Sequence, residues 1–561
     1  MGKAKPKSWP EGVPTSIKYP EITLPDMLKN SAKRHPAKTA IIFKGNKISY
    51  QELDEHVSRF ATALQDLGVK KGDVVGLMLP NVPQFIIGYY GAMRAGAIVT
   101  AISPLFQERE AAFQINNSGA KTIVVLDLFE SIVSSVKDEA KLKNIIVAKF
   151  ADYLSTGKRI FGKLLRKIPG KKVEKEAGVY FFKELIGKYP PEPKKVKIDP
   201  KEDLAILQYT GGTTGTPKGT MLTHYNLVSN AIACTKWLAG SKEGEETFLS
   251  ALPLFHIFGM TTSMNDAVAM AGTMVLIPKF GVADVLEEIE KNNVTIWCGV
   301  PTMYAILVAR PETTKFDLSS IKFCLSGAGA LPPEVQKAFM KITGGALVEG
   351  YGLTEASPVT HCNPLDPTLK TVKIGSIGLP FPDTEAKIMD AETGKKELPP
   401  GEVGELAVKG PQVMKGYWKL PEETKRALRK GWLYTGDLGK VDEEGYFYIV
   451  ERAKDLIKHK GYSVFPRELE DIAYEHPAVK LCTVVGKPDP VAGEIPKAFC
   501  VLKEGATATE KEIMDFVNKK VAKHKHIKEL EFRDALPQTL VGKVLRRELR
   551  DEEVRKAIPS K

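Results

Sequence analysis

The chain has 561 residues, of which 43% are hydrophobic and 26% charged, and its formal net charge is +12. One hydrophobic core stops growing at about 250–300 residues, so this length predicts at least two domains. The composition is ordinary for a soluble globular protein and excludes a membrane-spanning class, because no apolar run reaches the roughly 18 residues that cross a bilayer.

The N-terminal sequence, MGKAKPKSWPEG, lacks the apolar core that signal peptides carry. We therefore expect a cytoplasmic protein. A positive net charge can indicate a nucleic acid or an anionic membrane as partner. No nucleic-acid-binding motif occurs, so we expect no nucleic-acid partner, and part of the excess charge gathers in residues 158–172.

Between residue 36 and about residue 300, β-branched apolar runs alternate with helical patterns. The strand-like runs are TAIIF (39–43), DVVGLMLP (73–80) and KTIVVLD (121–127), and the helical patterns are residues 49–68 and 82–96. This alternation predicts crossover units and a largely parallel sheet that is covered by helices.

Residues 158–172, KRIFGKLLRKIPGKK, combine apolar and basic residues. The apolar ones recur at helical spacing (Ile160, Phe161, Leu164, Leu165 and Ile168), while Lys163, Arg166 and Lys167 fall elsewhere around the helix. A helix of this kind can lie on an anionic bilayer with its apolar side in the interface. The alternative is a helix that packs on its own domain and exposes a solvated basic face.

Three glycine-rich loops each follow an apolar, strand-like run. They lie in LAILQYTGGTTGTPKG (204–219), IKFCLSGAGALPPE (321–334) and GALVEGYGLTEASP (345–358). Parallel α/β sheets bind ligands at the carboxyl ends of their strands. We expect the three loops to share one rim and to build one nucleotide site.

The first loop is suited to phosphate, although it lacks the Gly-Lys-Ser/Thr of the common nucleoside-triphosphatase loop. Its backbone N–H groups can surround phosphate oxygens, and Lys218 adds a mobile positive charge. The hydroxyl groups that can join them belong to Thr210, Thr213, Thr214 and Thr216.

The other two loops offer complementary chemistry. Gly327, Ala328 and Gly329 leave room for a flat ring against the backbone. Tyr351 offers a stacking face and Glu355 a hard carboxylate that suits Mg²⁺. For Glu355 the alternative is a charge that stabilises a helix N-terminus.

The predicted secondary structure changes after about residue 370. Short strands with tight turns predict a β-rich subdomain over about 370–450, and residues 454–561 read as a compact α+β domain. Asp437, which we place in a tight turn, is positioned to accept two ribose hydroxyls; the alternative is an ordinary turn aspartate. The six cysteines are isolated from one another, and we expect buried, reduced thiols.

Five motifs occur in the order and spacing of the acyl-adenylate-forming superfamily, which includes acyl-CoA synthetases, adenylation domains and firefly luciferase. They are YTGGTTGTPKG, GYGLTE, YTGD, ERAKDLIKHKGY and LVGKVLRREL. The resemblance covers nearly the whole chain. Within the superfamily the chain is most similar to long-chain fatty acid–CoA ligases, as LSSIKFCLSGAGALP and VKGPQVMKGYWKLPEET indicate. The resemblance implies a large domain (1–453) of mostly parallel, helix-covered sheets with a β-rich subdomain, and a small mobile α+β domain (454–561).

The resemblance also implies a reaction in two steps. A fatty carboxylate attacks the α-phosphate of ATP, which releases pyrophosphate and leaves an acyl-adenylate. The thiol of coenzyme A then displaces AMP to give the thioester. ATP, coenzyme A, a fatty acid and Mg²⁺ are therefore the expected small molecules, and the attacking carboxylate needs no general base because it is already an anion.

Residue by residue, the resemblance assigns roles to these motifs. The first loop, with Gly211, Gly212, Thr213, Thr214, Gly215, Thr216 and Lys218, grips the β- and γ-phosphates, and Thr210 and Glu355 lie at Mg²⁺. Adenine lies among Ala328, Gly329, Ala330, Glu349, Gly350, Tyr351 and Gly352, and Lys454 is a further nucleotide-binding residue. Thr354 faces the α-phosphate, and Asp437 with Arg452 holds the ribose. Lys543 reaches the reacting groups in the first step. The small domain then turns about Lys454, and Lys458, Gly461 and Tyr462 approach to line the path of pantetheine.

The acyl pocket is expected among Phe255, His256, Ile257, Phe258, Val300, Pro301 and Thr302. His256 is either a gate of the acyl channel or a core histidine. Lys460 and Gly461 stand where many long-chain ligases have Gly-Gly, a form nearer to aryl-CoA ligases and luciferase. Two alternatives therefore stay open: an aryl- or medium-chain acyl-CoA ligase, and a non-catalytic lipid-binding membrane adaptor, against which Lys543, Glu355 and Asp437 argue. The oligomeric state stays open as well.

Overall fold

The computed structural model describes residues 8–155, 157–158, 169–210, 217–452, 454–460, 462–538 and 544–557. The chain packs into two compact units. The first is Met1–Glu385 with Lys409–Leu433, and the second is Ala386–Val408 with Tyr434–Lys561. The domain boundary predicted between residues 453 and 454 stays a prediction.

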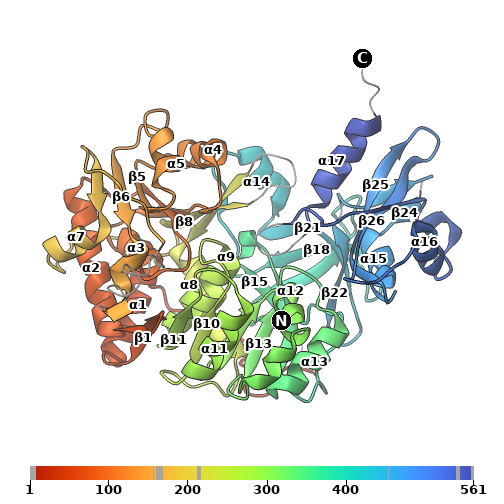
Figure 1. Cartoon of the computed structure of the whole chain (residues 1–561), viewed down its shortest axis with the longest axis horizontal. Coiled ribbons are helices and arrows are strands. Elements are labelled where there is room, and N and C mark those ends of the chain that lie inside the picture. Colours follow the sequence, from red (N-terminus) through yellow and green to blue (C-terminus); the bar gives the residue numbers. More distant parts are fainter. Residues whose placement is uncertain are drawn as a thin grey trace. The chain divides into compact units, whose positions relative to one another are not determined.

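Two mixed, mostly parallel sheets form the first unit, as the alternation of strands and helices predicts (Figure 1). The larger sheet has nine strands in the order β16-β15-β14-β13-β12-β10-β11-β1-β2. Its strands are β1 (Thr39–Phe43), β2 (Asn46–Ser49), β10 (Thr247–Ser250), β11 (Thr273–Leu276), β12 (Ile296–Gly299), β13 (Phe323–Ser326), β14 (Ala346–Gly352), β15 (Val359–Cys362) and β16 (Leu379–Pro380). Strands β14, β13, β12, β10, β11 and β1 run parallel, and β2, β15 and β16 are antiparallel to their neighbours.

The other sheet has eight strands in the order β19-β9-β8-β4-β3-β5-β6-β7. They are β3 (Val74–Met78), β4 (Ile98–Ala101), β5 (Thr122–Leu126), β6 (Asn144–Ala148), β7 (Val179–Phe181), β8 (Leu204–Thr210), β9 (Lys218–Thr223) and β19 (Gly416–Tyr417). The strands from β8 to β7 pair in parallel, while β8 and β9 form an antiparallel hairpin that β19 extends.

Helices cover both faces of the eight-stranded sheet. Figure 1 shows α4 and α5 on one side of β5 and β6 and α2 on the other. Within the described residues, the helices of the first unit are α1 (Leu24–Arg34), α2 (Tyr50–Asp66), α3 (Pro83–Arg94), α4 (Glu108–Ser118), α5 (Glu130–Ser135), α7 (Phe182–Lys188), α8 (His224–Trp237), α9 (Ile257–Gly259), α10 (Asp266–Ala269), α11 (Val282–Asn292), α12 (Pro301–Val308), α13 (Pro333–Thr343) and α14 (Pro421–Ala427). Short 3₁₀ turns are η1 (Phe150–Tyr153), η3 (Pro311–Lys315) and η4 (Thr354–Ala356), and η2 (Met260–Asn265) is a π-helical turn.

Local sequence signals account for two of these helices. Helix α2 begins where Ser49 and Glu52 form a capping box, and the apolar residues behind them recur at helical spacing. Helix α3 is apolar on every side and is buried from Pro83 to Met93. It can be so because α1, α2, β3 and β4 all pack against it, and a helix that is apolar all round is stable only when surrounded.

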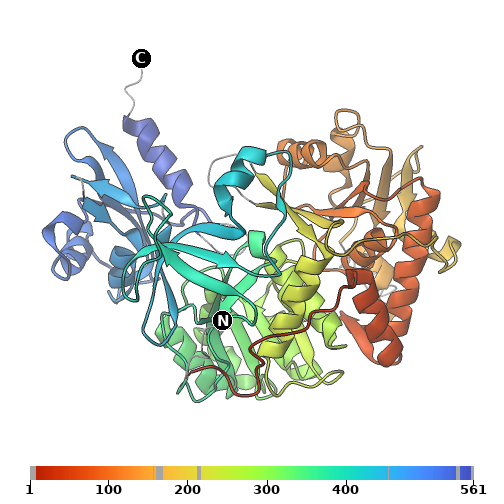
Figure 2. The same ribbon diagram turned by 180° about the vertical axis from the view of Figure 1, so that it is seen from behind.

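The N-terminal segment crosses the first unit before α1 begins (Figure 2). The Trp9 and Trp237 rings meet edge to face at 5.4 Å, and the Tyr19 hydroxyl donates to the Pro382 carbonyl at 3.1 Å. These contacts tie residues 8–23 to α8 and to the turn after β16.

Two five-stranded sheets contain the remaining strands of the described residues. The first has the order β17-β18-β21-β20, with β22 paired to β21; its strands are β17 (Glu385–Met389), β18 (Gly404–Lys409), β20 (Leu428–Arg429), β21 (Trp432–Val441) and β22 (Phe447–Arg452). The second has the order β24-β23-β26-β25, with β27 paired to β26; its strands are β23 (Ile457–His459), β24 (Tyr462–Val464), β25 (Val479–Asp489), β26 (Gly493–Leu502) and β27 (Glu529–Phe532). The remaining helices are α15 (Pro466–Tyr474), α16 (Glu510–Asn518), the 3₁₀ turn η5 (Lys523–Lys525) and α17 (Arg546–Ala557).

All six cysteines are buried, as predicted, and none is paired in a disulfide. Cys482 and Cys500 face each other across β25 and β26, with their sulfur atoms 3.2 Å apart. Among the residues that the structure describes, no helix combines the length and the apolar character needed to cross a membrane.

Candidate functional site

The second and third glycine-rich loops lie side by side, because they follow adjacent parallel strands. Ser326 at the end of β13 pairs with Glu349 in β14. The Glu349 side chain is buried, and its Oε2 accepts a hydrogen bond from the Leu331 N–H at 3.1 Å. The structure thus brings together the residues predicted around adenine: Ala328, Gly329, Ala330, Glu349, Gly350, Tyr351 and Gly352.

Close backbone approach explains the glycines of the third loop. A Cβ atom on Gly350 would lie 2.5 Å from Leu325 Cδ1, and one on Gly352 would lie 2.2 Å from the Pro358 carbonyl oxygen. Real Cβ atoms do not come so close to other heavy atoms. Glycine therefore lets β14 continue past β13 and pair with β15, which places Tyr351 opposite His361.

The first loop belongs to the other sheet, so the expectation that all three loops share one rim is wrong. It joins β8 to β9, two antiparallel strands in which Thr210 pairs with Lys218. The predicted residues Gly211, Gly212, Thr213, Thr214, Gly215 and Thr216 lie outside the described residues. The Gln208 amide donates to the Phe255 carbonyl at 3.0 Å, and this bond links β8 to the segment after β10.

Glu355 lies in η4 and is held by the segment between residues 414 and 418. The Met414 N–H donates to the Glu355 carbonyl at 2.8 Å, and the Tyr417 hydroxyl donates to Glu355 Oε1 at 2.7 Å. Lys218 Nζ lies 5.2 Å from the centre of the Tyr417 ring and 2.6 Å from a carboxylate oxygen of Glu423. Sequence reasoning missed Tyr417 and Glu423, although both lie in the quoted motif VKGPQVMKGYWKLPEET.

Two of the predicted acyl residues, Phe258 and Pro301, lie next to the second loop. His256 caps α9, since its Nδ1 accepts the Phe258 N–H at 3.3 Å, and Val300 and Pro301 begin α12. A Cβ atom on Gly327 would lie 2.9 Å from the Phe258 ring, and one on Gly329 would lie 3.7 Å from Pro301. His256 is half-buried, and its role as a gate of the acyl channel stays a prediction.

Asp437 and Arg452 are partners across β21 and β22 in the second unit, and Asp437 Oδ1 lies 3.3 Å from Arg452 Nε. The predicted tight turn at Asp437 is wrong, because this residue lies inside β21. Gly436 takes a φ of +73°, which glycine adopts without strain, so the chain kinks there while the strand runs on.

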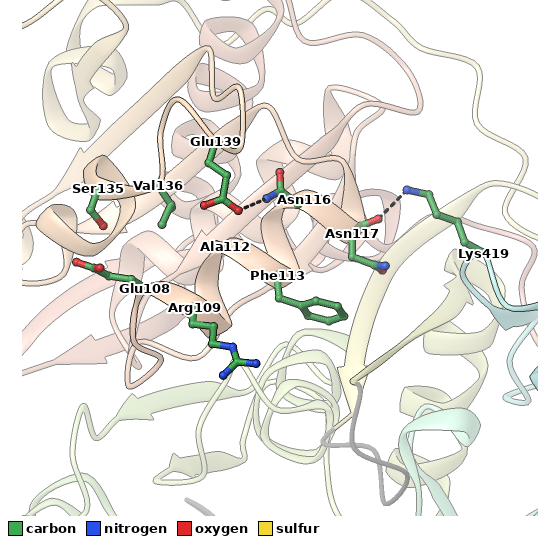
Figure 3. Close-up of a pocket in the computed structure, with 10 residues that line it drawn as sticks. All are labelled: Glu108, Arg109, Ala112, Phe113, Asn116, Asn117, Ser135, Val136, Glu139 and Lys419. Carbon is green, nitrogen blue, oxygen red and sulfur yellow. Dashed lines mark hydrogen bonds between the residues drawn. The ribbon is translucent and has the colours of Figure 1, made fainter.

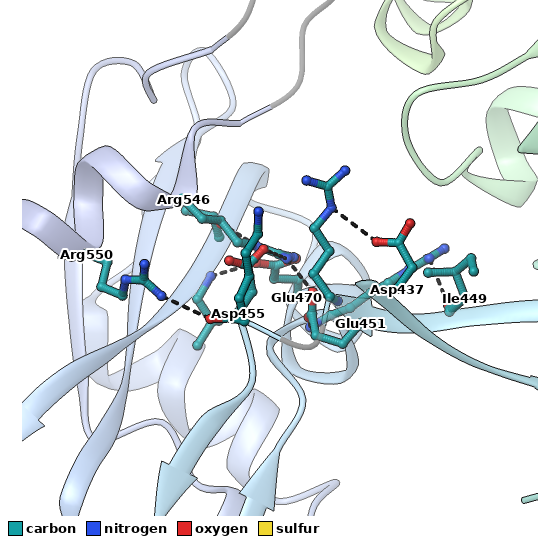
Figure 4. Close-up of polar contacts among 12 residues, drawn as sticks. Asp437, Ile449, Glu451, Asp455, Glu470, Arg546 and Arg550 are labelled. Carbon is teal, nitrogen blue, oxygen red and sulfur yellow. Dashed lines mark hydrogen bonds and ion pairs between the residues drawn. The ribbon is translucent and has the colours of Figure 1, made fainter. Parts of the chain in front are cut away.

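The segment after β22 is rich in charges, as the sequence indicates. Burial, and then the positive charge of Arg452, lower the pKa of Lys454 to about 8. Glu451, with a side chain 2% exposed, accepts a hydrogen bond from Arg546 Nη1 at 2.6 Å, and Arg546 also pairs with Glu470 (Figure 4).

The residues predicted along the pantetheine path are partly described. The Lys458 N–H donates to Glu494 Oε2 at 2.8 Å. Tyr462 is 59% exposed, and its ring lies 4.8 Å from that of His524. Gly461 and Lys543 lie outside the described residues.

A magnesium ion would find few protein ligands here. In the described parts of the chain, no three His, Cys, Asp or Glu side chains gather to hold a metal. Mg²⁺ commonly binds through one or two carboxylates together with substrate phosphates. The Glu355 carboxylate is of the kind that such a site uses, and the pairing of Thr210 with Glu355 at the ion stays a prediction.

A separate cavity of about 840 Å³ lies beside α4 (Figure 3). Its wall includes Arg109, Phe113 and Glu139, and Lys419 closes one side by donating to the Asn117 carbonyl at 2.9 Å. None of the predicted site residues lines this cavity.

Comparison with known proteins shows the family to which the chain belongs. Residues 28–418 match the family described as AMP-binding enzyme, and residues 468–543 match the AMP-binding enzyme C-terminal domain. The chain belongs to the AMP-binding enzyme family. A curated relative from Bacillus subtilis (strain 168), named long-chain-fatty-acid–CoA ligase, is 45% identical to this AMP-binding enzyme over 550 residues, which cover 97% of each chain.

Solved structures of similar fold support the same family. ATP-bound MatB from Rhodopseudomonas palustris has a TM-score of 0.82 at 29% identity and covers 95% of this AMP-binding enzyme and 99% of its own chain. The anthranilate CoA ligase AuaEII, in complex with anthranoyl-AMP, has a TM-score of 0.83 at 27% identity and covers 96% and 98%. The predicted fold class is confirmed.

Proposed function

We propose that this AMP-binding enzyme is a long-chain fatty acid–CoA ligase that forms AMP and pyrophosphate. The observation that carries the proposal is the 45% identity, over 97% of both chains, with a relative named long-chain-fatty-acid–CoA ligase. The adjacent loops around Glu349 and the carboxylate of Glu355 support it, because they put the residues expected at adenine and a carboxylate suited to a cation in the same unit.

In the first step, a fatty carboxylate oxygen bonds to the α-phosphorus of ATP, and the bond to the bridging oxygen breaks to release pyrophosphate. Ala328 to Ala330 and Glu349 to Gly352 hold adenine, Asp437 with Arg452 binds the ribose, and Thr354 faces the α-phosphate. Lys218 with residues 211–216 binds the leaving pyrophosphate, and Lys543 neutralises charge at the reacting groups.

Thr210 and Glu355 would hold Mg²⁺ together with the phosphates, and the ion would supply positive charge at the leaving group. The acyl chain lies among Phe255, His256, Ile257, Val300 and Pro301. These residues come from the segment after β10 and from the start of α12, which the contacts of Phe258 and Pro301 bring to the second loop.

In the second step, the thiol of coenzyme A attacks the acyl carbon, AMP leaves and the thiol proton goes to solvent. We infer that residues 1–453 and 454–561 act as two domains for this purpose. The smaller domain turns about Lys454, which withdraws Lys543 and brings Lys458, Gly461 and Tyr462 to the path of pantetheine. The exposed ring of Tyr462 supports this role.

An aryl-acid substrate is the second candidate. Lys460 and Gly461 stand where many long-chain ligases carry two glycines, and AuaEII, of similar fold, is an anthranilate CoA ligase. A non-catalytic lipid-binding adaptor is the third candidate, and a protein without ligase activity would favour it.

We also infer that the cytoplasmic protein touches anionic membrane through residues 158–172. Residues 159–168 lie outside the described residues, so the support is the pattern of apolar and basic residues in the sequence. A fatty acid of low solubility is most accessible at a membrane surface.

The test is pyrophosphate release and acyl-CoA formation with palmitate, octanoate and benzoate, each with and without coenzyme A. Each buried methylene contributes about 0.8 kcal/mol, so kcat/KM should rise about fourfold per methylene from octanoate upward. Higher kcat/KM with benzoate would select the second candidate. If no acid releases pyrophosphate, the synthetase proposal is wrong.

A further inference from the structure

Tyr417 occupies a position between two charged groups of opposite sign. Its hydroxyl donates to Glu355 Oε1 at 2.7 Å, and Lys218 Nζ lies over its ring at 5.2 Å from the centre. Glu355 is on η4 and Lys218 on β9, so the tyrosine joins two elements that are distant in the chain.

The backbone fixes Tyr417 in this place. Strand β19 pairs with β9, so that Tyr417 lies opposite Thr220, and the Trp418 N–H donates to the Gly219 carbonyl at 2.7 Å. On the other side, the Tyr417 N–H donates to the Thr424 hydroxyl at 2.9 Å. Because the N–H groups of Tyr417 and Trp418 are both bonded, the tyrosine has little freedom to move away from Glu355.

The chemistry of the two groups fixes the direction of their hydrogen bond. A phenol O–H can donate, whereas an ionised carboxylate can only accept, so Tyr417 donates to Glu355. One oxygen of Glu355 is thus occupied by the tyrosine, and the plane of the carboxylate is set.

We propose that Tyr417 is a positioning residue that orients the Glu355 carboxylate toward a divalent cation and holds Lys218 toward the pyrophosphate end of ATP. This inference rests on the proposed function. A carboxylate with one oxygen anchored presents the other in a fixed direction, which favours binding of a cation that demands regular geometry. The face of the Tyr417 ring attracts the positive charge of Lys218 and so restrains the position of the lysine.

Glu423 has a defined part in this arrangement. It pairs with Lys218 at 2.6 Å, and the two side chains are 18% and 28% exposed, for lysine and glutamate respectively. A triphosphate must compete with this carboxylate for the lysine. When the ion pair between Lys218 and Glu423 breaks, the Tyr417 ring still holds the lysine near the phosphates.

The experiment compares the full-length wild-type protein with Tyr417→Phe, which removes the hydroxyl and keeps the ring. The probe is α,β-methylene-ATP, which cannot release pyrophosphate, titrated calorimetrically at several Mg²⁺ concentrations. Direct Mn²⁺ binding in its presence, followed by electron paramagnetic resonance, reports on the cation without turnover. Hydrogen bonds to charged groups predict about tenfold weaker binding of Mn²⁺ and of the magnesium-bound probe.

AMP, which lacks the pyrophosphate end, should bind Tyr417→Phe as it binds wild type. Tyr417→Leu removes the ring as well and should weaken the probe by a further factor of about three. In a Glu355→Gln background, Tyr417→Phe should have almost no additional effect on Mn²⁺, because the two residues act as one unit. Tyr19→Phe is the matched control, since it removes another half-buried tyrosine hydroxyl, one that donates to Pro382.

The outcomes separate this inference from the proposed function. If wild type fails to bind the probe, the proposed function itself is wrong. If wild type binds and Tyr417→Phe matches it in Mn²⁺ and probe affinity, only the positioning role is wrong. Equal weakening of AMP and of the probe would mean that Tyr417 merely supports the fold, which also overturns the inference.

Discussion

Glu451 and Arg546 lie 95 positions apart in the chain, yet Arg546 Nη1 donates to Glu451 Oε1 at 2.6 Å. The other oxygen of Glu451 accepts the Arg467 N–H at 2.9 Å, and the side chain is 2% exposed. Arg546 Nε also donates to Glu470 Oε1 at 3.1 Å. One guanidinium on α17 thus satisfies carboxylates from β22 and α15.

Replacing Arg546 by Met should destabilise the second unit by about 3–5 kcal/mol, because Glu451 and Glu470 would be left with buried, unpaired charges. The measurement is native-state hydrogen exchange of the full chain, read on α15, β25 and α17. Arg547→Met is the matched control: its partner Asp551 is exposed, so the change should stay below about 1 kcal/mol. Similar effects of the two variants would contradict the assignment.

His224 should make the first unit sensitive to acid. It is buried, and burial lowers its pKa to about 4, below the ordinary value of about 6.5. The unfolded chain then binds more protons between these two values, so stability is full above about pH 6.5 and falls as the pH drops toward 4. The loss attributable to His224 is about 3 kcal/mol.

The check is urea unfolding between pH 4 and pH 7 for wild type and His224→Asn. The variant should show a shallower fall in stability over this window. His526→Asn, in the second unit, serves as control and should leave the slope of the first unit unchanged. An identical slope in wild type and His224→Asn would refute the prediction.

Lys454 should be unusually reactive toward acylating reagents. With its pKa lowered to about 8, about half of its amine is neutral at pH 8, whereas an ordinary lysine is almost wholly protonated there. We expect limited acetic anhydride to label Lys454 early, with a reactivity that levels off above about pH 8. Peptide mass spectrometry across pH 6–10 measures this, with the other labelled lysines of the chain as internal comparison. A yield at Lys454 that keeps rising beyond pH 9, as for ordinary lysines, would exclude the shift.

Lys543 and Lys458 should affect different half-reactions. Lys543→Ala should slow adenylation by about 10²–10³-fold, because a charge at the reacting phosphate is lost, and should leave thioester formation from supplied acyl-adenylate almost intact. Lys458→Ala should show the opposite pattern. Pyrophosphate release and single-turnover acyl transfer measure the two steps. Equal loss of both steps in either variant would contradict the turning of the small domain.

The basic segment should bind anionic vesicles through charge. Reversing Lys163, Arg166 and Lys167 to Glu should weaken binding by at least about 1 kcal/mol per residue, as measured by sedimentation with phosphatidylserine-containing vesicles. Binding to neutral phosphatidylcholine vesicles is the control and should hardly change. If the triple variant binds anionic vesicles as wild type does, the segment packs on its own domain.

Many helices and strands of the first unit could be predicted, because hydrophobic periodicity and helix capping depend only on residues close together in the sequence. The strand over 39–43 and the helix over 82–96 are confirmed as β1 and α3, with ends that differ by at most two residues. The pairing of strands was not predictable, since β8 and β13 end in similar glycine-rich loops and only long-range packing assigns them to different sheets.

Local sequence signals predicted the wrong structure at Asp437 and gave no prediction at Tyr417. Gly436-Asp437 has the composition of a turn, but one glycine with positive φ lets β21 pass through it. Tyr417 lies in a strand of two residues, which carries no period that sequence reasoning can detect. The roles of the site residues stay predictions, because they depend on ligands and not on the fold alone.

The return of residues 409–433 to the first unit constrains how the protein is made. Strand β9 is completed by β19, which the ribosome delivers almost two hundred residues later. Until then β9 is an open edge, whose unpaired N–H and C=O groups can recruit a strand from another chain. We expect a chain that stops at Glu385 to aggregate, and the nascent first unit to need a chaperone, or a pause in elongation, before its sheet can close.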